Sequence, residues 1–547
     1  MDSSNSTAAH GGSSLALAAL QTSLLVRAFF TILAICVCTR VISSYRYRSI
    51  KYSQGRNVAP PTIPYWIPGL RHALSLALDN KHFMARCFTK YGDGTPFFLD
   101  GAGEKMLFVR DPEHVKTVLM SAQHFDPNPF VHDKILGALM GSPQKTIDYY
   151  NSPGVNTDYI QITHIRQHTT GSGLSLLDKQ MFDFMKQSVQ QALEATPGNE
   201  WKHVPDLFDF ITCHVTHAIL VSILGSSLVE GYPQLVDDLW KLIEATPEFF
   251  MGLPRFAMPK SYAARDRLLD KLREYSSKSE EVRKSNQADT KWDPVAGSGL
   301  LQEREKMYSE LPDHDVQARA SQTLGLMYGA TSLVVPITFW YLFEILRDPK
   351  MHAYVSSEIQ AHATPESGTY NLMQLATRPL IQSLHAETTR LYSSNLAVRQ
   401  VTSPVFNLDD KYTVTKGTDI FISNKFNGQF SAAWAEARPN ALERPLDVFW
   451  AERFLVEGKG RDKKETFSDA GLSGNWTSYG GGEHKCPGRH FARHIGLTTL
   501  AILMGEYEIE MVDKEAASKT VPPINKAAWG TMKPTGKVGV RIRKRKA

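Results

Sequence analysis

The sequence contains few cysteines for its length. Five occur in 547 residues, and their spacing follows no regular pattern: Cys36, Cys38, Cys87, Cys213 and Cys486. An odd and sparse set of this kind excludes a disulfide framework and predicts reduced thiols on the cytosolic side of a membrane.

A strong charge of one sign is also absent. The net charge is +5, and lysine and arginine are spread along the chain. The one basic run, Arg541 to Lys546, is a short tail of the kind that is usually solvated, so we expect no nucleic-acid partner. With 42% apolar and 21% charged residues, the composition is that of a globular protein with a large core.

Several signatures of other protein classes are missing. No Gly-Lys-Ser/Thr follows the glycines at 480–482, so a phosphate loop is excluded there. The chain has no Rossmann fingerprint and no Ser–His–Asp pattern. It also shows no internal repeat and no low-complexity segment. Without a repeat or a low-complexity segment to divide it, the body of the chain is expected to form one large domain.

One long apolar run is present near the amino end, from Leu15 to Ile42. Its length suffices to cross a hydrocarbon core of about 30 Å. Arg27 interrupts it, and a charge at mid-bilayer costs at least ~2.5 kcal/mol. A span from Ala28 to Ser44 places Arg27 and Arg40 near the two interfaces, where they can snorkel. A cleaved signal peptide is the alternative, but its usual basic start is missing.

Lysine and arginine follow this run but do not precede Arg27. The asymmetry predicts a single-pass helix in the endoplasmic reticulum membrane, with a lumenal amino end and a cytosolic body. The sequon at Asn5 would then be lumenal, which makes Asn5 a candidate glycosylation site.

A proline-rich stretch follows, with four prolines in nine residues: Pro60, Pro61, Pro64 and Pro68. This density predicts a stiff, extended spacer. We therefore expect residues 1–56 to form a tail, an anchor and a basic stop-transfer segment. Residues 57–547 are expected to form one catalytic domain.

The body of the chain shows mainly helical patterns. Apolar residues recur at spacings of three and four over Phe182 to Ala195, Leu207 to Leu224 and Leu235 to Ala245. Short β-like runs occur at Met106–Val109 and Tyr412–Ser423. This arrangement predicts a mainly α, α+β fold with a small β region.

Cys486 stands between the glycines at 480–482 and a helix-like segment that begins at Pro487. Glycine permits positive φ angles and the close approach of a flat ligand, and the first amides of a helix can donate towards a sulfur anion. A thiolate is one of the axial ligands that proteins offer to haem iron. Cys486 is therefore a candidate haem ligand. The alternatives are a buried core cysteine and a zinc ligand, although no suitably spaced Cys or His accompanies it.

Cys213, His214 and His217 have a spacing that resembles a metal site. They lie in a strongly apolar helical segment with no fourth ligand, so ordinary packing is favoured.

Two further signals precede Cys486. Glu387 and Arg390 are three residues apart on a helical segment and share one face. Arg453 lies 33 residues before Cys486 within an aromatic stretch, and it could complete a buried Glu–Arg–Arg network. Burial requires such completion, because desolvating one ion pair rarely repays itself.

The order of these elements resembles the cytochrome P-450 family. The family's cysteine pattern has an aromatic residue, a glycine, a basic residue, the cysteine and a second glycine. The matching residues here are Tyr479, Gly482, His484, Cys486 and Gly488, with Tyr for the usual Phe and His for the usual Arg. The resemblance covers nearly the whole chain, including the anchor and the proline spacer.

The resemblance implies that Cys486 is the proximal ligand of a b-type haem in a loop that includes Gly482 and Gly488. Glu387, Arg390 and Arg453 would be the structural triad. Haem propionates need cationic or polar partners, and His484 and Arg399 occupy positions that supply them in the family. Arg166 is a further candidate, although the tryptophan that usually accompanies it is missing.

The long helix expected from Val316 to Leu346 would cross the distal face of the haem. Most monooxygenases carry a glycine, an acid and a threonine there. In this chain Ser332 falls at the acid position and Leu333 at the threonine position, and Thr331 offers a second hydroxyl. Pro336 removes one helical hydrogen bond and predicts a kink.

Within the family, the strings Pro336 to Phe343 and Cys486 to Ala492 resemble the branch of the sterol hydroxylases of bile-acid synthesis and prostacyclin synthase. The sequence around Cys486 is similar to that of many fungal enzymes of secondary-metabolite biosynthesis. The resemblance implies a monooxygenase that oxidises a terpenoid, a sterol or a related lipophilic molecule with molecular oxygen.

Electrons would come from NADPH through a separate cytochrome P-450 reductase, with cytochrome b5 as an additional partner. Lys485, Arg489 and Arg493 are the candidate docking cations. Two alternatives stay open. One is a reductase-independent isomerase or dehydratase acting on a peroxide, and the other is a non-catalytic haem protein that binds a lipid.

Overall fold

The computed structural model describes residues 10–193, 200–285, 287–364, 366, 368–458, 464–515, 530–534 and 536–545. Asn5 lies outside the described residues. The chain forms two compact units, Met1–Val109 with Pro404–Ile420, and Arg110–Ser403 with Phe421–Ala547.

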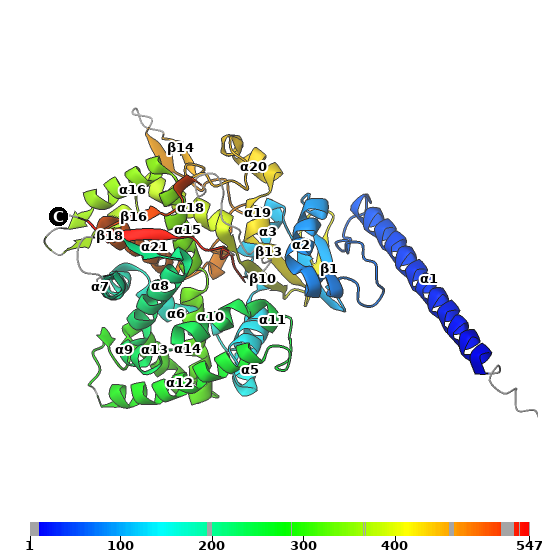
Figure 1. Cartoon of the computed structure of the whole chain (residues 1–547), viewed down its shortest axis with the longest axis horizontal. Coiled ribbons are helices and arrows are strands. Elements are labelled where there is room, and N and C mark those ends of the chain that lie inside the picture. The colour runs from blue at the N-terminus through cyan, green and yellow to red at the C-terminus, as the bar shows by residue number, and fades with distance from the viewer. Residues whose placement is uncertain are drawn as a thin grey trace, which may run out of the picture. The chain divides into compact units, whose positions relative to one another are not determined.

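The first unit begins with a long helix, α1 (His10–Lys51), the blue element of Figure 1. The other elements of this unit are α2 (Ala73–Tyr91), β1 (Phe97–Gly101), β2 (Glu104–Phe108), β11 (Val405–Asn407) and β12 (Thr413–Thr415). The pairs β1–β2 and β11–β12 are antiparallel. Phe88, Phe97 and Phe108 are buried together and form the aromatic core of this unit.

The apolar stretch of α1 is exposed along its described side chains, from Leu25 to Ile42. Within the described residues, α8 and the segment of α14 and α15 are also apolar enough to cross a membrane, but 72% of each apolar window is buried in the protein. Of these three described segments, α1 is the one that presents an apolar surface that a bilayer can surround.

The second unit is mainly helical. Its helices are α3 (Pro112–Met120), α4 (Asn128–Phe130), the π-helical η1 (Val131–Leu139), α5 (Gln144–Tyr150), α6 (Thr157–His168), α7 (Gly171–Leu193), α8 (Leu207–Leu224), α9 (Ser226–Gly231), α10 (Leu235–Glu244), α11 (Thr246–Phe250), α12 (Pro259–Lys284), α13 (Gly299–Glu310), α14 (Val316–Thr331), α15 (Val334–Arg347), α16 (Pro349–Ala361), α17 (Leu372–Leu375), α18 (Pro379–Tyr392), α19 (Asn424–Gly428), α20 (Ser431–Ala437), η2 (Pro439–Leu442), η3 (Gly482–His484) and α21 (Arg489–Gly505).

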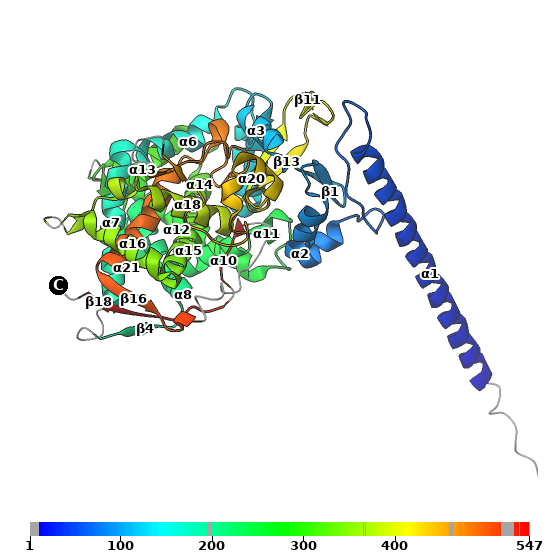
Figure 2. The same ribbon diagram turned by 90° about the horizontal axis from the view of Figure 1, so that it is seen from above.

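The strands of this unit are short. They are β3 (Phe125–Asp126), β4 (Lys202–Val204), β5 (Trp292–Asp293), β6 (Gly297–Ser298), β7 (Ala363–Thr364), β8 (Thr369–Tyr370), β9 (Ser393–Ser394), β10 (Leu396–Val401), β14 (Leu455–Glu457), β15 (Glu465–Phe467), β16 (Tyr507–Met511), β17 (Gly530–Thr531) and β18 (Val540–Lys544), while β13 (Asp419–Ser423) runs into this unit from the first. In one sheet β18 pairs with both β16 and β4, and Figure 2 shows these three strands side by side. The expectation of a mainly α fold with a small β region is confirmed.

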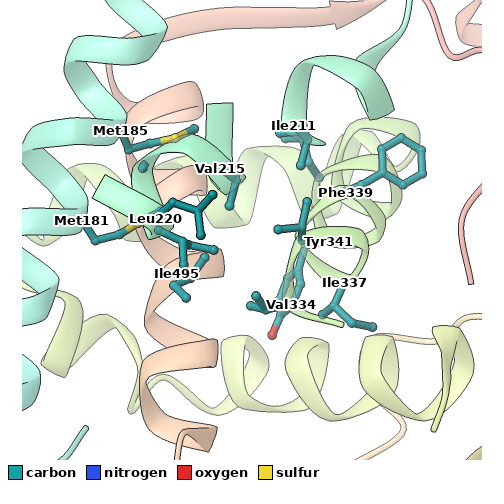
Figure 3. Packing of buried hydrophobic residues seen from close by; sticks show 14 of the residues in the cluster. Met181, Met185, Ile211, Val215, Leu220, Val334, Ile337, Phe339, Tyr341 and Ile495 are labelled. Carbon is teal, nitrogen blue, oxygen red and sulfur yellow. The ribbon is translucent and has the colours of Figure 1, made fainter. Parts of the chain in front are cut away.

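The core of the second unit lies where α7, α8, α15 and α21 meet. Figure 3 shows the side chains that gather there: Met181 and Met185 from α7, Ile211, Val215 and Leu220 from α8, Val334, Ile337, Phe339 and Tyr341 from α15, and Ile495 from α21. These helices carry apolar residues on more than one face because each is enclosed by its neighbours. This packing fixes the positions of α15 and α21, and both helices contribute residues to the cavity beside Cys486.

The long helix expected over Val316 to Leu346 is divided in two. The first part, α14, ends at Thr331 and the second, α15, starts at Val334; Leu333 between them has φ −105° and ψ −40°. The break lies one turn before Pro336, whose ring crowds the carbonyl four residues earlier, at Ser332. The predicted kink is therefore confirmed, and its position brings Leu333 to the break.

Candidate functional site

Cys486 lies between η3 and α21, in the loop that the sequence singles out. Its backbone N–H donates to the carbonyl oxygen of Tyr479 at 2.9 Å, and the guanidinium of Arg489 donates to the Cys486 carbonyl at 3.1 Å. Burial raises the pKa of the Cys486 thiol, whereas the backbone N–H groups of Gly488 and Arg489 and the charge of Arg489 act to lower it. The loop thus directs its donors at the sulfur, as a thiolate ligand requires.

The helix after this cysteine begins at Arg489, with Gly488 at its N-cap, two residues later than the sequence predicts. Pro487 therefore precedes the helix and does not open it. Because Gly488 and Arg489 are the first residues of the turn, their N–H groups have no helical acceptor and are available to the sulfur.

The glycines at 480–482 have separate roles. Gly480 and Gly482 have φ angles of +69° and +64°, as expected, but Gly481 is extended, so the prediction of a positive φ was wrong for it. A Cβ at Gly482 would meet the carbonyl oxygen of Leu119 at 2.0 Å. Gly482 is required by close contact with the end of α3, and Gly480 is the member of the run that faces the cavity.

A cavity of about 320 Å³ lies beside Cys486. On one side it is bounded by Gly329, Leu333, Val334 and Ile337 from α14, α15 and the break between them. The side chains of this wall are apolar, and a Cβ at Gly329 would meet nothing within 4 Å. The wall leaves open space opposite the thiol, which suits a flat apolar ligand.

A cationic group stands at the edge of the same cavity. Arg399 is 5% exposed, and its guanidinium donates to the carbonyl of its neighbour Val398 at 2.8 Å. Burial lowers the pKa of Arg399 to about 10, against the opposing charges of Asp126 and Asp158. His484 also lines the cavity, with Nδ1 3.6 Å from a carboxylate oxygen of Asp158.

The residues present fit a haem. The donor set is one cysteine sulfur with amides directed at it, an apolar wall opposite, and a buried guanidinium and an imidazole that suit propionates. Three of the expected contacts do not line this cavity: Gly482, Gly488 and Arg166. Arg166 is exposed on α6.

The two expected distal hydroxyls do not line the cavity. Thr331 is fully buried, and its hydroxyl donates to the carbonyl oxygen of Met327 within the same helix at 2.7 Å. Ser332 is 6% exposed and interacts with Tyr328. Of the three distal candidates, only Leu333 contributes to the cavity wall.

Glu387, Arg390 and Arg453 lie together as a buried network. The Glu387 carboxylate accepts from Nε of Arg390 at 2.7 Å and from Nε of Arg453 at 2.9 Å, and all three side chains have no exposed surface. Nη2 of Arg390 also donates to this carboxylate at 2.9 Å, whereas Nη1 of Arg390 and both Nη groups of Arg453 donate to backbone carbonyls, including those of Gly428 and Val448. The network joins α18 to the loops that lead to Cys486.

Sequence reasoning did not identify the role of His385. Its imidazole is buried between two tyrosines: Tyr341 Oη contacts Nδ1, and Tyr479 Oη lies 2.8 Å from Nε2. Burial lowers the pKa of His385 to about 3, so it is neutral. Tyr479, at the position where the family usually has Phe, thereby ties the cysteine loop to α18 and α15. A histidine two residues before the glutamate of Glu-x-x-Arg was the available signal.

The sequence analysis also did not predict that polar side chains line part of the cavity. Ser393 and Asn395, directly after α18, line the cavity and are paired, with Ser393 Oγ 2.5 Å from Asn395 Oδ1. The run Ser-Ser-Asn after an apolar helix end was the signal for a polar cavity wall.

A larger cavity of about 950 Å³ lies elsewhere in the second unit, next to α8 and α10. It is lined by charged groups of both signs together with Cys213 and His217. Within the described residues, no group of three or more His, Cys, Asp or Glu side chains is arranged to hold a metal ion. His214 pairs with Ser188 at 2.8 Å and lies against the ring of Phe210.

Comparison with known proteins adds an independent line of evidence. The family model described as cytochrome P-450 matches residues 60–538. The cytochrome P-450 monooxygenase fsoE of Humicola fuscoatra is 27% identical over 526 residues, which cover 90% of this chain and 89% of that protein. The cytochrome P-450 monooxygenase efuG of Hormonema carpetanum is 29% identical over 517 residues, covering 89% and 90%. Cytochrome P-450 7B1 of Mus musculus is 23% identical over 473 residues, covering 83% and 85%.

Proposed function

Because the chain belongs to the cytochrome P-450 family, we propose that it is a membrane-anchored haem-thiolate monooxygenase that oxidises a lipophilic small molecule. Relatives that cover most of its length are named monooxygenases, so the chain is an oxidoreductase. The family match over residues 60–538 supports a single catalytic domain over residues 57–547 behind an anchor segment.

The observation that carries the proposal is the cavity beside Cys486. A partly buried thiol with two backbone amides directed at it shares a cavity with an apolar wall built by Leu333, Val334 and Ile337. Haem held by Cys486, with Arg399 and His484 at its propionates, would supply the activation of oxygen. The apolar wall excludes water and favours a hydrophobic substrate.

The proposed substrate class is supported by this lining and by the relatives. Apolar side chains on one wall and a short polar segment, Ser393 to Asn395, on another suit a mostly hydrocarbon molecule with a polar group. A terpenoid, a sterol or a related intermediate of fungal secondary metabolism has this character.

Electrons are proposed to reach the site from NADPH through a separate reductase, with cytochrome b5 as an additional donor. Lys485 is exposed next to Cys486, whereas Arg489 and Arg493 are partly buried. Because it is the exposed member of the three, Lys485 is the better placed docking cation. The anchor supports the proposal that the body lies on the cytosolic face of the endoplasmic reticulum, where such partners are found.

The test is to express the full chain with a cytochrome P-450 reductase in microsomes and to supply candidate terpenoids and sterols under labelled oxygen. We expect a product that contains one labelled oxygen atom and forms only when NADPH is present. A Cys486→Ser variant, which keeps the size of the side chain, should bind no haem with a thiolate spectrum and form no product.

A second function is favoured by one observation, the absence of a cavity-facing hydroxyl from Thr331 or Ser332. Without a proton-donating group on this wall, the site also suits a rearrangement or dehydration of a peroxide, which needs no external electrons. Turnover of a peroxide substrate that continues without NADPH and reductase would establish this second function and contradict the first.

A further inference from the structure

A groove of about 380 Å³ in the first unit is separate from the haem site. It lies between α1 at Arg40, the proline spacer and α2. We call it the interface groove and define it by Arg40, Trp66, Arg71, His72, Arg86 and Lys90. It combines an indole ring with four cationic side chains, and none of the residues that line it is acidic.

The cations of the interface groove outnumber the carboxylates near it. Arg71 pairs with Asp100, and Arg86 lies 3.3 Å from Asp79. Arg40 donates to the carbonyl of Pro64 and to Tyr91 Oη, and its guanidinium lies 5.5 Å from the centre of the Trp66 ring. Lys90 lies 5.6 Å from the Tyr91 ring. Within the described part of the chain, Arg40 and Lys90 form no ion pair, so the groove keeps two uncompensated positive charges.

A neutral hydrogen-bond donor lies at the base of the groove. His72 is 2% exposed, and burial lowers its pKa to about 4. The N–H of Asp100 donates to its Nδ1 at 3.0 Å, so Nε2 carries the proton. Nε2 lies near the carbonyls of Ile63 and Pro64 but reaches hydrogen-bond geometry with no described residue. A buried donor without a good acceptor is costly, and an anionic oxygen would satisfy it.

The groove lies at the level where the apolar surface of α1 ends. Val41 and Ile42 are 62% and 53% exposed, and the exposed Tyr45 follows them. Ser43 donates to the carbonyl of Tyr65 at 3.1 Å, so the spacer contacts α1 at this boundary. Tyrosine and tryptophan favour the headgroup region of a bilayer. A phosphate in the groove would therefore stand at headgroup depth.

An apolar strip continues from the groove. Trp66, Leu70, Leu74 and Leu78 are 54%, 48%, 47% and 78% exposed, and the last two are one helical turn apart on α2. Trp66 and Leu74 belong to the groove lining itself. Exposed apolar side chains beside a cationic pocket match a molecule that joins an anionic head to hydrocarbon chains.

We propose that the interface groove binds the phosphate of one anionic glycerophospholipid, with Arg40, Lys90 and His72 on the phosphate and the acyl chains along α1, Trp66 and Leu74. This inference rests on the membrane anchor in the proposed function. Bound lipid neutralises the two free cations and covers the exposed strip, which holds the first unit against the membrane surface.

The test uses the full-length protein with haem, extracted from bilayers of phosphatidylcholine containing one tenth phosphatidylserine, and measures by mass spectrometry the lipid that stays bound. We expect phosphatidylserine to be enriched in the bound lipid. An Arg86→Gln, Lys90→Gln double variant should lower this enrichment about 25-fold, since each cation near an anionic surface changes binding about fivefold. Both side chains are exposed, so folding is preserved.

The matched control is Lys105→Gln with Lys416→Gln, which removes two exposed lysines of the same unit outside the groove. It should leave the enrichment unchanged. An equal loss in the control pair, or equal retention of both lipids by the unaltered protein, would overturn the proposal.

Inorganic phosphate added in excess distinguishes a lipid from a free anion. It should leave the bound phosphatidylserine in place because it makes no contact with Trp66 or Leu74; displacement by phosphate would assign the groove to a free anion and overturn the lipid proposal. NADPH-dependent turnover is measured on the same samples. If the lipid preference is lost but turnover is intact, only the proposal of lipid binding in the groove is overturned. If turnover is absent but the lipid preference is intact, only the oxidation proposal is overturned.

Discussion

Glu387 holds two guanidinium groups in a region shielded from solvent. Its carboxylate accepts from Arg390 and Arg453 and also from the backbone N–H of Trp450 at 3.0 Å. Two buried cations on one anion are stable only because the other guanidinium hydrogens reach carbonyl oxygens. Removal of the carboxylate would therefore leave both arginine side chains without their counter-ion.

We predict that Glu387→Gln lowers the free energy of unfolding by about 3–5 kcal/mol, because it leaves two buried charges without a counter-ion. The measurement is the thermal midpoint of haem loss and of helical circular dichroism. Glu436→Gln changes an exposed residue of α20 in the same way and should alter the free energy by less than about 0.5 kcal/mol. Equal midpoints for the two variants would show that the network contributes nothing.

A second residue-scale prediction concerns Tyr479. Tyr479→Phe restores the residue usual in the family but removes the hydroxyl that lies 2.8 Å from His385 Nε2. We expect a loss of about 1–3 kcal/mol, because a buried ring nitrogen then has no partner. Thermal unfolding of this variant is compared with that of Tyr159→Phe, which alters a tyrosine that is 55% exposed. A Tyr479→Phe protein as stable as the control would contradict the prediction.

At the scale of elements, Glu344 couples α15 to α18. It is 2% exposed, accepts a hydrogen bond from Tyr392 and lies 3.3 Å from Nε of Arg347. Burial raises the pKa of Glu344 to about 7, which outweighs the opposing charge of Arg347. The folded protein therefore binds this proton more tightly than the unfolded chain.

The consequence is a pH dependence with a definite sign. The contribution of Glu344 is fully present below its unfolded pKa of 4.5 and is lost as pH rises to about 7, with an upper limit of about 3 kcal/mol. We predict that Glu344→Gln flattens the decline of the thermal midpoint between pH 5 and pH 8. Glu310→Gln, at an exposed end of α13, should keep the slope of the unaltered protein. An unchanged slope in Glu344→Gln would assign the decline to other groups.

At the scale of the whole molecule, the anchor prediction depends on α1 alone. The other two apolar segments are 72% buried, so they are occupied by the core and not available to a bilayer. We predict that the full chain stays in the membrane fraction after alkaline extraction, whereas a chain lacking residues 2–39 is released. Equal retention of both chains would show that another surface is sufficient to hold the protein on the membrane.

Local patterns in the sequence determined much of this protein. The helix of Leu207–Leu224 was predicted at its observed bounds, because the spacing of apolar residues is a local signal. The glycine turn, Cys486 and the family follow from short motifs in the same way. Pro336 predicted the break in the distal helix, since its effect reaches only one turn back.

Only the tertiary structure decided which side chains meet. It separated Thr331 and Ser332 from the cavity, placed Leu333 in its wall, exposed Arg166, and set His385 between Tyr341 and Tyr479. It also gathered Arg40, His72 and Lys90 around one groove. These outcomes depend on contacts between residues far apart in the chain and on small rotations of a helix about its axis. Spacing along a sequence gives the period of a helix, but packing against its neighbours selects the face that lines a site.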